Sequence, residues 1–126
     1  KYEALGQRDD AAVTAMGRTV DFHMMIGADR VEARMRQVAT AIKEGMTKLP
    51  GVEITTSMDP ALSAGVVIFK PGSLAPRKVF AKLYETYHIG GAGMGPNIRL
   101  STHIYNTLGE ADRAVAAISE MLKDGV

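Results

Sequence analysis

The residues best suited to chemistry gather near the end of the chain, in the stretch NIRLSTHIYNTLGEADRAV at positions 97–115. Arg99 stands in a run that alternates between apolar and polar residues, as a strand with one solvated face does. Such an arginine is either solvated and paired with a nearby acid, or it grips a carboxylate with its planar guanidinium. The residue pattern alone leaves both interpretations open.

Ser101 and His103 are predicted to lie on the same strand face as Arg99. The serine and the histidine would be about 7 Å apart by strand rise, and no acid is placed to orient the histidine. A serine hydrolase is therefore disfavoured, while His103 stays a candidate for lining a site. His23 and His88 lie on other predicted elements without the spacing of metal ligands, so no metal site is expected.

The glycine-rich segment GGAGMG, residues 90–95, invites comparison with a phosphate-binding loop. Its glycines are spaced differently from G-x-G-x-x-G, and a predicted strand follows where the motif requires a helix N-terminus. The segment is predicted to be a hairpin or loop.

Length and composition exclude several classes of protein. A chain of 126 residues with 46% apolar content suits one domain, and a net charge of +1 gives no case for nucleic acid or a membrane surface as a partner. The absence of cysteine excludes a disulfide, a thiolate zinc site and a thiol nucleophile within these residues. The chain opens at Lys1 and is interpreted as a fragment or processed product, expected in the cytoplasm, with an upstream targeting signal left open.

Two helices are predicted at the start of the chain from apolar residues that recur with helical spacing. The first spans residues 9–26, begins at Asp9 or Asp10 and ends at Gly27. The second follows at once with the D-x-x-E sequence of residues 29–32, which resembles a capping box, and ends at KLPG.

Two more helices are predicted further along the chain. Pro76 suits the first turn of one of them. Thr107 and Glu110 form a T-x-x-E capping box at the start of the last helix. Asn106 and Thr107 are accordingly predicted to cap this helix rather than to touch a substrate.

Strands are predicted at residues 52–57, 64–69 and 97–106, with a short extra strand near HIGG. From residue 28 onward the order is helix, strand, strand, helix, one or two strands, helix. This order predicts an α+β sandwich, in which a small mixed or antiparallel sheet is covered by helices on one face. The helix at 9–26 does not obviously belong to this sandwich.

The segment IRLSTHIYNTLGEADRAVAAI resembles the closing segment of the class V aminotransferases. These pyridoxal-phosphate enzymes include cysteine desulfurases and isopenicillin N epimerase-like proteins. Their pattern is an arginine, one apolar residue, a serine, and a tyrosine-asparagine-threonine before an acidic helix. Arg99, Ser101, Tyr105, Asn106 and Thr107 match it here. The segment GADRVEARMRQVATAIKEGMTKLPGVEI is similar to the long interdomain helix of the family and the first strand after it.

The resemblance implies roles for particular residues. Arg99 would bind the α-carboxylate of an amino-acid substrate. Gly6 and Gln7 stand where family members carry a glycine-threonine pair that contacts the cofactor phosphate of the neighbouring subunit in a homodimer. Gln7 departs from the usual threonine, and glutamine offers an amide of different reach.

The resemblance also identifies what this stretch lacks. The Schiff-base lysine of the family follows a small residue and a histidine, whereas Lys1 is followed by Tyr2 and Glu3. The aspartate and the stacking ring that hold the cofactor in the family are absent as well. The chain alone is therefore expected to be inactive and to bind no pyridoxal phosphate, because a separate N-terminal domain would carry the cofactor.

These observations lead to one interpretation and one alternative. Residues 1–27 are interpreted as the end of a large cofactor domain, and residues 28–126 as the small C-terminal domain of fold type I pyridoxal-phosphate enzymes. The alternative is a stand-alone, non-catalytic α+β module that binds a ligand or a partner.

Overall fold

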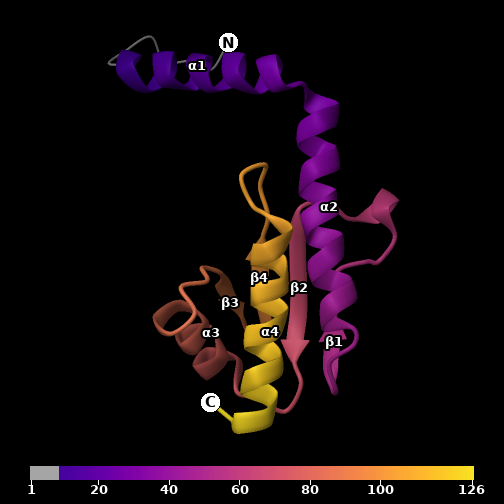
Figure 1. The fold of residues 1–126 in the computed structure, drawn as a ribbon. Coiled ribbons are helices and arrows are strands. Elements are labelled where there is room, and N and C mark those ends of the chain that lie inside the picture. Colours follow the sequence, from indigo (N-terminus) through magenta and orange to yellow (C-terminus); the bar gives the residue numbers. More distant parts are fainter. Residues whose placement is uncertain (1–8) are drawn as a thin grey trace.

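The computed structural model describes residues 9–126 and contains a four-stranded sheet with helices beside it (Figure 1). The elements run in the order α1 (Asp10–Ile26), α2 (Ala28–Met46), β1 (Val52–Ile54), a 3₁₀ turn η1 (Pro60–Leu62), β2 (Val66–Pro71), α3 (Pro76–Glu85), β3 (Ala92–Met94), β4 (Asn97–Ser101) and α4 (Leu108–Asp124). The predicted order of elements from residue 28 is confirmed.

The sheet is antiparallel throughout, with the strand order β1-β2-β4-β3. The longest pairing joins β2 to β4, so these two strands form the centre and β1 and β3 form the edges. β3 and β4 make a tight hairpin, since Met94 pairs with Asn97 across Gly95, whose φ is +60°. The glycine-rich segment is thus a hairpin, as predicted, because glycine adopts the left-handed backbone that such turns require.

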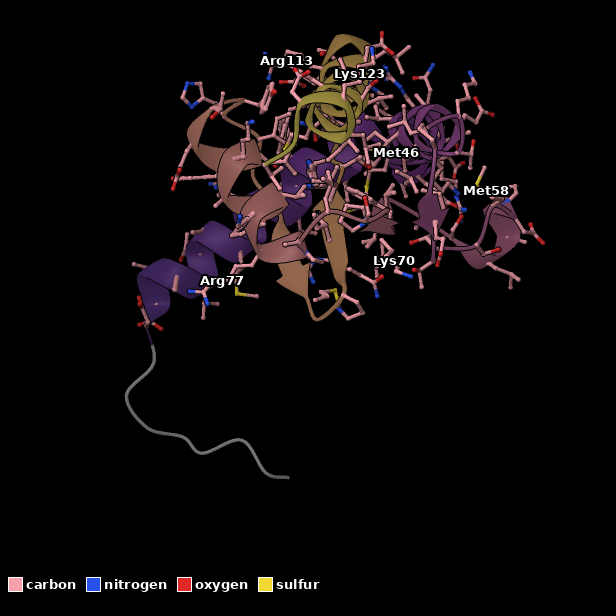
Figure 2. All side chains as sticks on the ribbon, turned by 90° about the horizontal axis from the view of Figure 1, so that it is seen from below. Met46, Met58, Lys70, Arg77, Arg113 and Lys123 are labelled. Atoms are coloured by element: carbon pink, nitrogen blue, oxygen red, sulfur yellow. The ribbon has the colours of Figure 1, made fainter. Side chains whose placement is uncertain are left out.

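One face of the sheet carries the core. Val67, Phe69, Ile98 and Leu100 point from the two central strands toward α2, α3 and α4 and are almost fully buried. Figure 2 shows Met46 of α2 between the helices and the sheet, whereas Lys70 of β2 points away from the helices. The opposite face of the sheet is covered by no element of residues 9–126. The α+β prediction is confirmed, with its helices on one side.

The helix α1 stands apart from this core as an arm (Figure 1). Asp9, one of the two predicted caps, caps α1 by accepting a hydrogen bond from the N–H of Ala12. None of its residues is buried, and large apolar side chains such as Met16 and Met24 are 69% and 76% exposed. It meets α2 at Gly27, whose φ of +95° turns the chain between the two helices.

The predicted capping box at residues 29–32 is wrong. α2 begins at Ala28, and its N-cap is Gly27, which has no side chain to accept a hydrogen bond. Asp29 therefore lies inside the first turn, where its charge favours the helix N-terminus without capping it. The sequence pattern placed the N-cap two residues too late, at Asp29 instead of Gly27, because the two helices are joined by a single residue.

The segment between β1 and β2 is held by cations of α2. The buried ammonium of Lys43 donates to the carbonyl of Ser57 at 3.0 Å and to the hydroxyl of Ser63 at 2.9 Å. Arg36 donates to the carbonyls of Pro60 and Ser63. The strand predicted at 52–57 ends at Ile54 in the structure, and these side-chain contacts hold the segment that follows it.

Candidate functional site

Arg99 lies at the centre of the uncovered sheet face. Its strand, β4, pairs on one side with β2 and on the other with β3, which places Ile68 and Ala92 directly opposite Arg99. Its neighbours in the strand, Ile98 and Leu100, are 0% and 4% exposed on the core face, so Arg99 points outward and is exposed. Within residues 9–126, no hydrogen bond or ion pair occupies its guanidinium. The surface pairing that would make it an ordinary strand residue is therefore not seen there.

The backbone that carries Arg99 is fixed from several sides. Besides its two strand partners, it is approached closely by the chain at Gly91, where a Cβ would lie 2.8 Å from the carbonyl oxygen of Arg99. Only glycine allows this approach without a shift of the backbone. Because this backbone is fixed, only the side chain of Arg99 can move, which favours a defined position for a bound anion.

The strand ends earlier than predicted. β4 stops at Ser101 rather than at position 106, because residues 103–106 form a turn in which the Asn106 N–H donates to the carbonyl of His103 at 3.1 Å. Thr102, just before this turn, points into the protein and is 6% exposed. The Thr102 N–H donates to the carbonyl of Gly65 at 2.7 Å, and its hydroxyl lies 3.0 Å from the carbonyl of Met35 on α2. The prediction that His103 shares a strand face with Arg99 is wrong, because His103 lies in the loop after β4.

His103 lies beside two other aromatic rings near the junction of α1 and α2. Its ring centroid is 4.8 Å from that of Tyr105 and 5.8 Å from that of His23, the latter in an edge-on arrangement. Its Nδ1 is buried without a hydrogen-bond partner in the described part of the chain. The meeting of His23 and His103 was not predicted, and no spacing in the sequence could have indicated it, because the two residues lie on distant elements.

The loop after β4 is tied down at both ends. Arg34 of α2 donates to the carbonyl of Asn106 at 2.8 Å, and the Asn106 side chain accepts from the N–H of His103 at 2.8 Å. The predicted capping box is confirmed, since Thr107 and Glu110 exchange both hydrogen bonds, at 3.2 and 2.8 Å. Thr107 thus caps α4, as predicted, whereas Asn106 holds the loop and is not the cap, although its amide donates to Glu110 at 3.4 Å.

Hydrogen bonds also set the acidity of Glu110. Donation from the backbone N–H of Thr107, helped by the side chain of Asn106, lowers the pKa of the Glu110 carboxyl below its ordinary value. The carboxylate is thus stabilised in its charged form at the N-terminus of α4, where the helix dipole favours negative charge as well.

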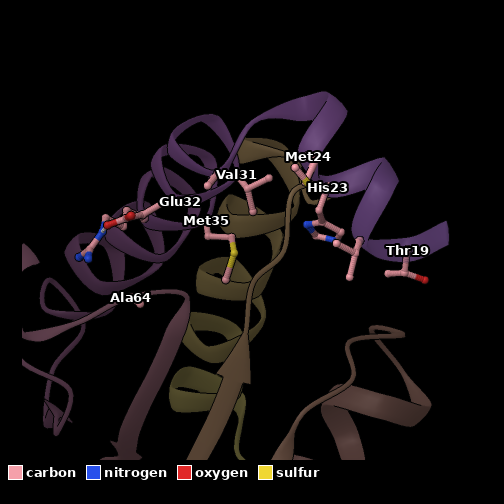
Figure 3. Close-up of a pocket in the computed structure, with 10 residues that line it drawn as sticks. Thr19, His23, Met24, Val31, Glu32, Met35 and Ala64 are labelled. Atoms are coloured by element: carbon pink, nitrogen blue, oxygen red, sulfur yellow. Dashed lines mark hydrogen bonds and ion pairs between the residues drawn. The ribbon is translucent and has the colours of Figure 1, made fainter. Parts of the chain in front are cut away.

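A groove of about 670 Å³ lies between α1 and α2 (Figure 3). Apolar side chains such as Met24, Val31 and Met35 line it, and Ala64 closes it on the side of β2. Its charged pair, Glu32 and Arg36, is joined at 2.8 Å within α2. The groove offers apolar packing and no unpaired charge for chemistry, so Arg99 remains the stronger candidate.

The residues that the structure describes do not fit a pyridoxal phosphate site. The buried lysine, Lys43, lies on the helix-covered side of the sheet, opposite the face that carries Arg99. Lys70 shares the face of Arg99 but is half-exposed and paired with Glu53 at 3.4 Å. The predicted phosphate contacts, Gly6 and Gln7, lie outside the described residues.

Metal and membrane sites are not found in residues 9–126 either. No cluster of three metal-ligating His, Asp or Glu side chains occurs in this range. None of the helices described there has the length and apolar character needed to cross a bilayer.

Comparison with known proteins agrees with the resemblance noted in the sequence. The chain is 31% identical to an isopenicillin N epimerase of Amycolatopsis lactamdurans and 28% identical to one of Streptomyces clavuligerus, over 96% of its length in both cases. It spans 32% of the length of each relative. These relatives confirm its similarity to class V aminotransferase-like proteins. No protein-family model matches the chain.

The fold is also found in a solved structure. The apo structure of a cysteine desulfurase from Thermococcus onnurineus NA1 superposes with a TM-score of 0.87 at 24% identity. The match covers 97% of this chain and 33% of the desulfurase. The α+β arrangement therefore occurs as about a third of a larger protein.

Proposed function

We propose that this chain is the C-terminal part of a pyridoxal-phosphate-dependent, class V aminotransferase-like enzyme, and that Arg99 binds the α-carboxylate of its amino-acid substrate. The proposal rests on one structural observation: an exposed guanidinium, unpaired within residues 9–126, at the centre of an uncovered sheet face. The two isopenicillin N epimerases support it, because similarity extends over almost the whole chain.

Arg99 can contribute orientation and binding energy. Its planar guanidinium can donate two parallel hydrogen bonds to a carboxylate, and hydrogen bonds to charged groups contribute about 1.5–3 kcal/mol each. Because β4 is paired on both sides, the carboxylate would be held at one place relative to the rest of the enzyme. Positioning of this kind is a large part of what an enzyme supplies to a bound substrate.

The cofactor would be held by residues outside this chain. Pyridoxal phosphate supplies the electron sink for chemistry at the α-carbon of amino acids. The residues of 9–126 offer no lysine suited to it, so in this proposal an N-terminal domain carries the cofactor and residues 1–27 are its last part. The proposed enzyme is a homodimer, with Gly6 and Gln7 near the cofactor phosphate of the other subunit.

The test uses the product of the complete gene. Arg99→Gln should lower kcat/KM for the amino-acid substrate about 100-fold, as expected for loss of a charged, two-point contact of about 3 kcal/mol. Arg77→Gln is the matched control, because Arg77 is an exposed arginine of α3 whose loss should leave kcat/KM unchanged (Figure 2).

Two results would count against the proposal. If Arg99→Gln and Arg77→Gln have equal kcat/KM, Arg99 does not bind the substrate. If the complete gene product lacks the visible absorbance of protein-bound pyridoxal phosphate, the chain is not part of such an enzyme. The stand-alone binding module would then be the better explanation.

A further inference from the structure

The residues around Arg99 indicate which kind of side chain a carboxylate bound to Arg99 can have. The uncovered sheet face consists of the outward residues of all four strands: Glu53, Val66, Ile68, Lys70, Ala92, Met94, Asn97, Arg99 and Ser101. A carboxylate on Arg99 necessarily places its substituent over some of these side chains.

The residues directly beside Arg99 are apolar. Ile68 on β2 and Ala92 on β3 stand opposite it in the register, where Cβ atoms of paired residues lie about 4.5–5.5 Å apart. Both are half-buried. Val66 and Met94 extend the apolar surface diagonally and are 40% and 44% exposed. An arginine flanked on both sides by apolar side chains can bind a molecule that has one charged end and one apolar end.

Among residues 9–126, the other charged residues of this face already have a partner. Glu53 on β1 and Lys70 on β2 are paired with each other at 3.4 Å. Asn97 and Ser101 are neutral neighbours within β4. A second carboxylate on the side chain of the ligand would therefore lose hydration without gaining an unpaired cation on this face.

We propose that the Arg99 site selects carboxylates whose side chain is apolar, and that Ile68 and Ala92 are the residues that contact this side chain. This inference rests on the proposed carboxylate-binding role of Arg99. Burial of apolar surface gives up to about a fourfold gain in affinity for each methylene. A partly open sheet face should give about a twofold gain.

The experiment is an NMR titration of the 126-residue chain with acetate, butyrate, hexanoate and glutarate at constant ionic strength. The Nε–H signal of Arg99 and the δ1 methyl signal of Ile68 report the two parts of the site. We expect both signals to shift with hexanoate, and the affinity to increase in the order acetate, butyrate, hexanoate. Glutarate should bind more weakly than hexanoate.

Two variants separate the apolar contact from the charge. Ile68→Thr keeps a β-branched residue in the strand and should abolish the gain in affinity with chain length. Leu62→Thr is the control, because Leu62 is an apolar residue of η1 that is 75% exposed and belongs to another part of the surface. It should leave the whole series unchanged.

The outcomes distinguish this inference from the proposed function. Equal affinities for acetate and hexanoate, or glutarate as tight as hexanoate, would overturn the selection of apolar substituents while Arg99 still binds carboxylates. The same conclusion follows if Ile68→Thr leaves the series intact. If no carboxylate shifts the Arg99 signal up to its solubility limit, both the inference and the carboxylate-binding role of Arg99 fail.

Discussion

At the scale of single residues, the cations of this chain divide by what they bind. Arg34, Arg36 and Lys43 of α2 all donate to backbone carbonyls of loops that pack on that helix. These hydrogen bonds hold the loops against the helix. Arg99 has no such role within residues 9–126, so its guanidinium is available to a ligand.

Glu110 leads to a prediction about pH. Its pKa is lowered in the folded chain, so its ionised form stabilises the fold at pH values above its ordinary pKa of 4.5. This contribution is lost as the pH falls through the lower, folded-state pKa. Glu110→Gln should therefore reduce the free energy of unfolding at about pH 7 and have a smaller effect at about pH 3. Urea denaturation at the two pH values measures the difference.

The control for this prediction is Glu44→Gln, at an exposed position of α2 whose side chain makes no hydrogen bond within residues 9–126. It should change the free energy of unfolding little at either pH. If Glu110→Gln is as harmless as Glu44→Gln at neutral pH, the capping box does not stabilise α4 through the charge of Glu110.

At the scale of elements, the hairpin β3–β4 gives a matched pair of glycines. A Cβ at Gly91 would lie 2.8 Å from the carbonyl oxygen of Arg99, whereas a Cβ at Gly93 would meet nothing within 4 Å. Gly91→Ala should therefore cost about 1–3 kcal/mol, since the backbone of β4 must move. Gly93→Ala should cost less than about 0.5 kcal/mol. Thermal or urea denaturation of both variants makes the comparison.

Equal stabilities of the two glycine variants would show that the chain at Gly91 does not pack closely on β4. A second readout is available, because a shift of β4 would also displace Arg99. Gly91→Ala should weaken acetate binding in the NMR titration, whereas Gly93→Ala should not.

The elements themselves could largely be predicted from the sequence. Helical spacing and the T-x-x-E motif located α4 and its cap, and alternation located the inward residues Ile98 and Leu100. The end of β4 was missed, because alternation continues past Thr102 into the turn of residues 103–106, where the Asn106 side chain accepts from the N–H of His103. The meeting of His23 and His103 was missed because it joins distant parts of the chain, about which local patterns contain no information.

The candidate site was predictable only in part. The residue Arg99 and its outward direction followed from alternation in one strand. Its neighbours Ile68 and Ala92 did not, because they depend on the order and register of three strands. A one-residue slip of β2 would place the core residue Val67 or Phe69 beside Arg99 instead, and a slip of β3 would place a glycine there. The chemistry around a sheet residue is therefore a property of the assembled sheet.

At the scale of the whole molecule, the arm α1 and the remainder of the fold differ in what they bury. Every buried apolar core residue lies between Val38 and Met121, and none lies on α1. The free energy of folding should therefore reside in residues 28–126. The exposed apolar side chains of α1, by contrast, form a surface that favours association with other protein surfaces.

Removal of residues 1–27 tests this division. The shortened chain should keep its cooperative unfolding, with a change of at most about 1 kcal/mol in the free energy of unfolding, because no residue of α1 is buried. It should also associate less than the 126-residue chain in sedimentation velocity runs at increasing concentration. Met16→Gln in the 126-residue chain is the matched surface change, since this side chain is 69% exposed. This variant should reduce association without altering the free energy of unfolding. A shortened chain that fails to fold would contradict the boundary at Gly27, and α1 would then have to be counted as part of the same domain.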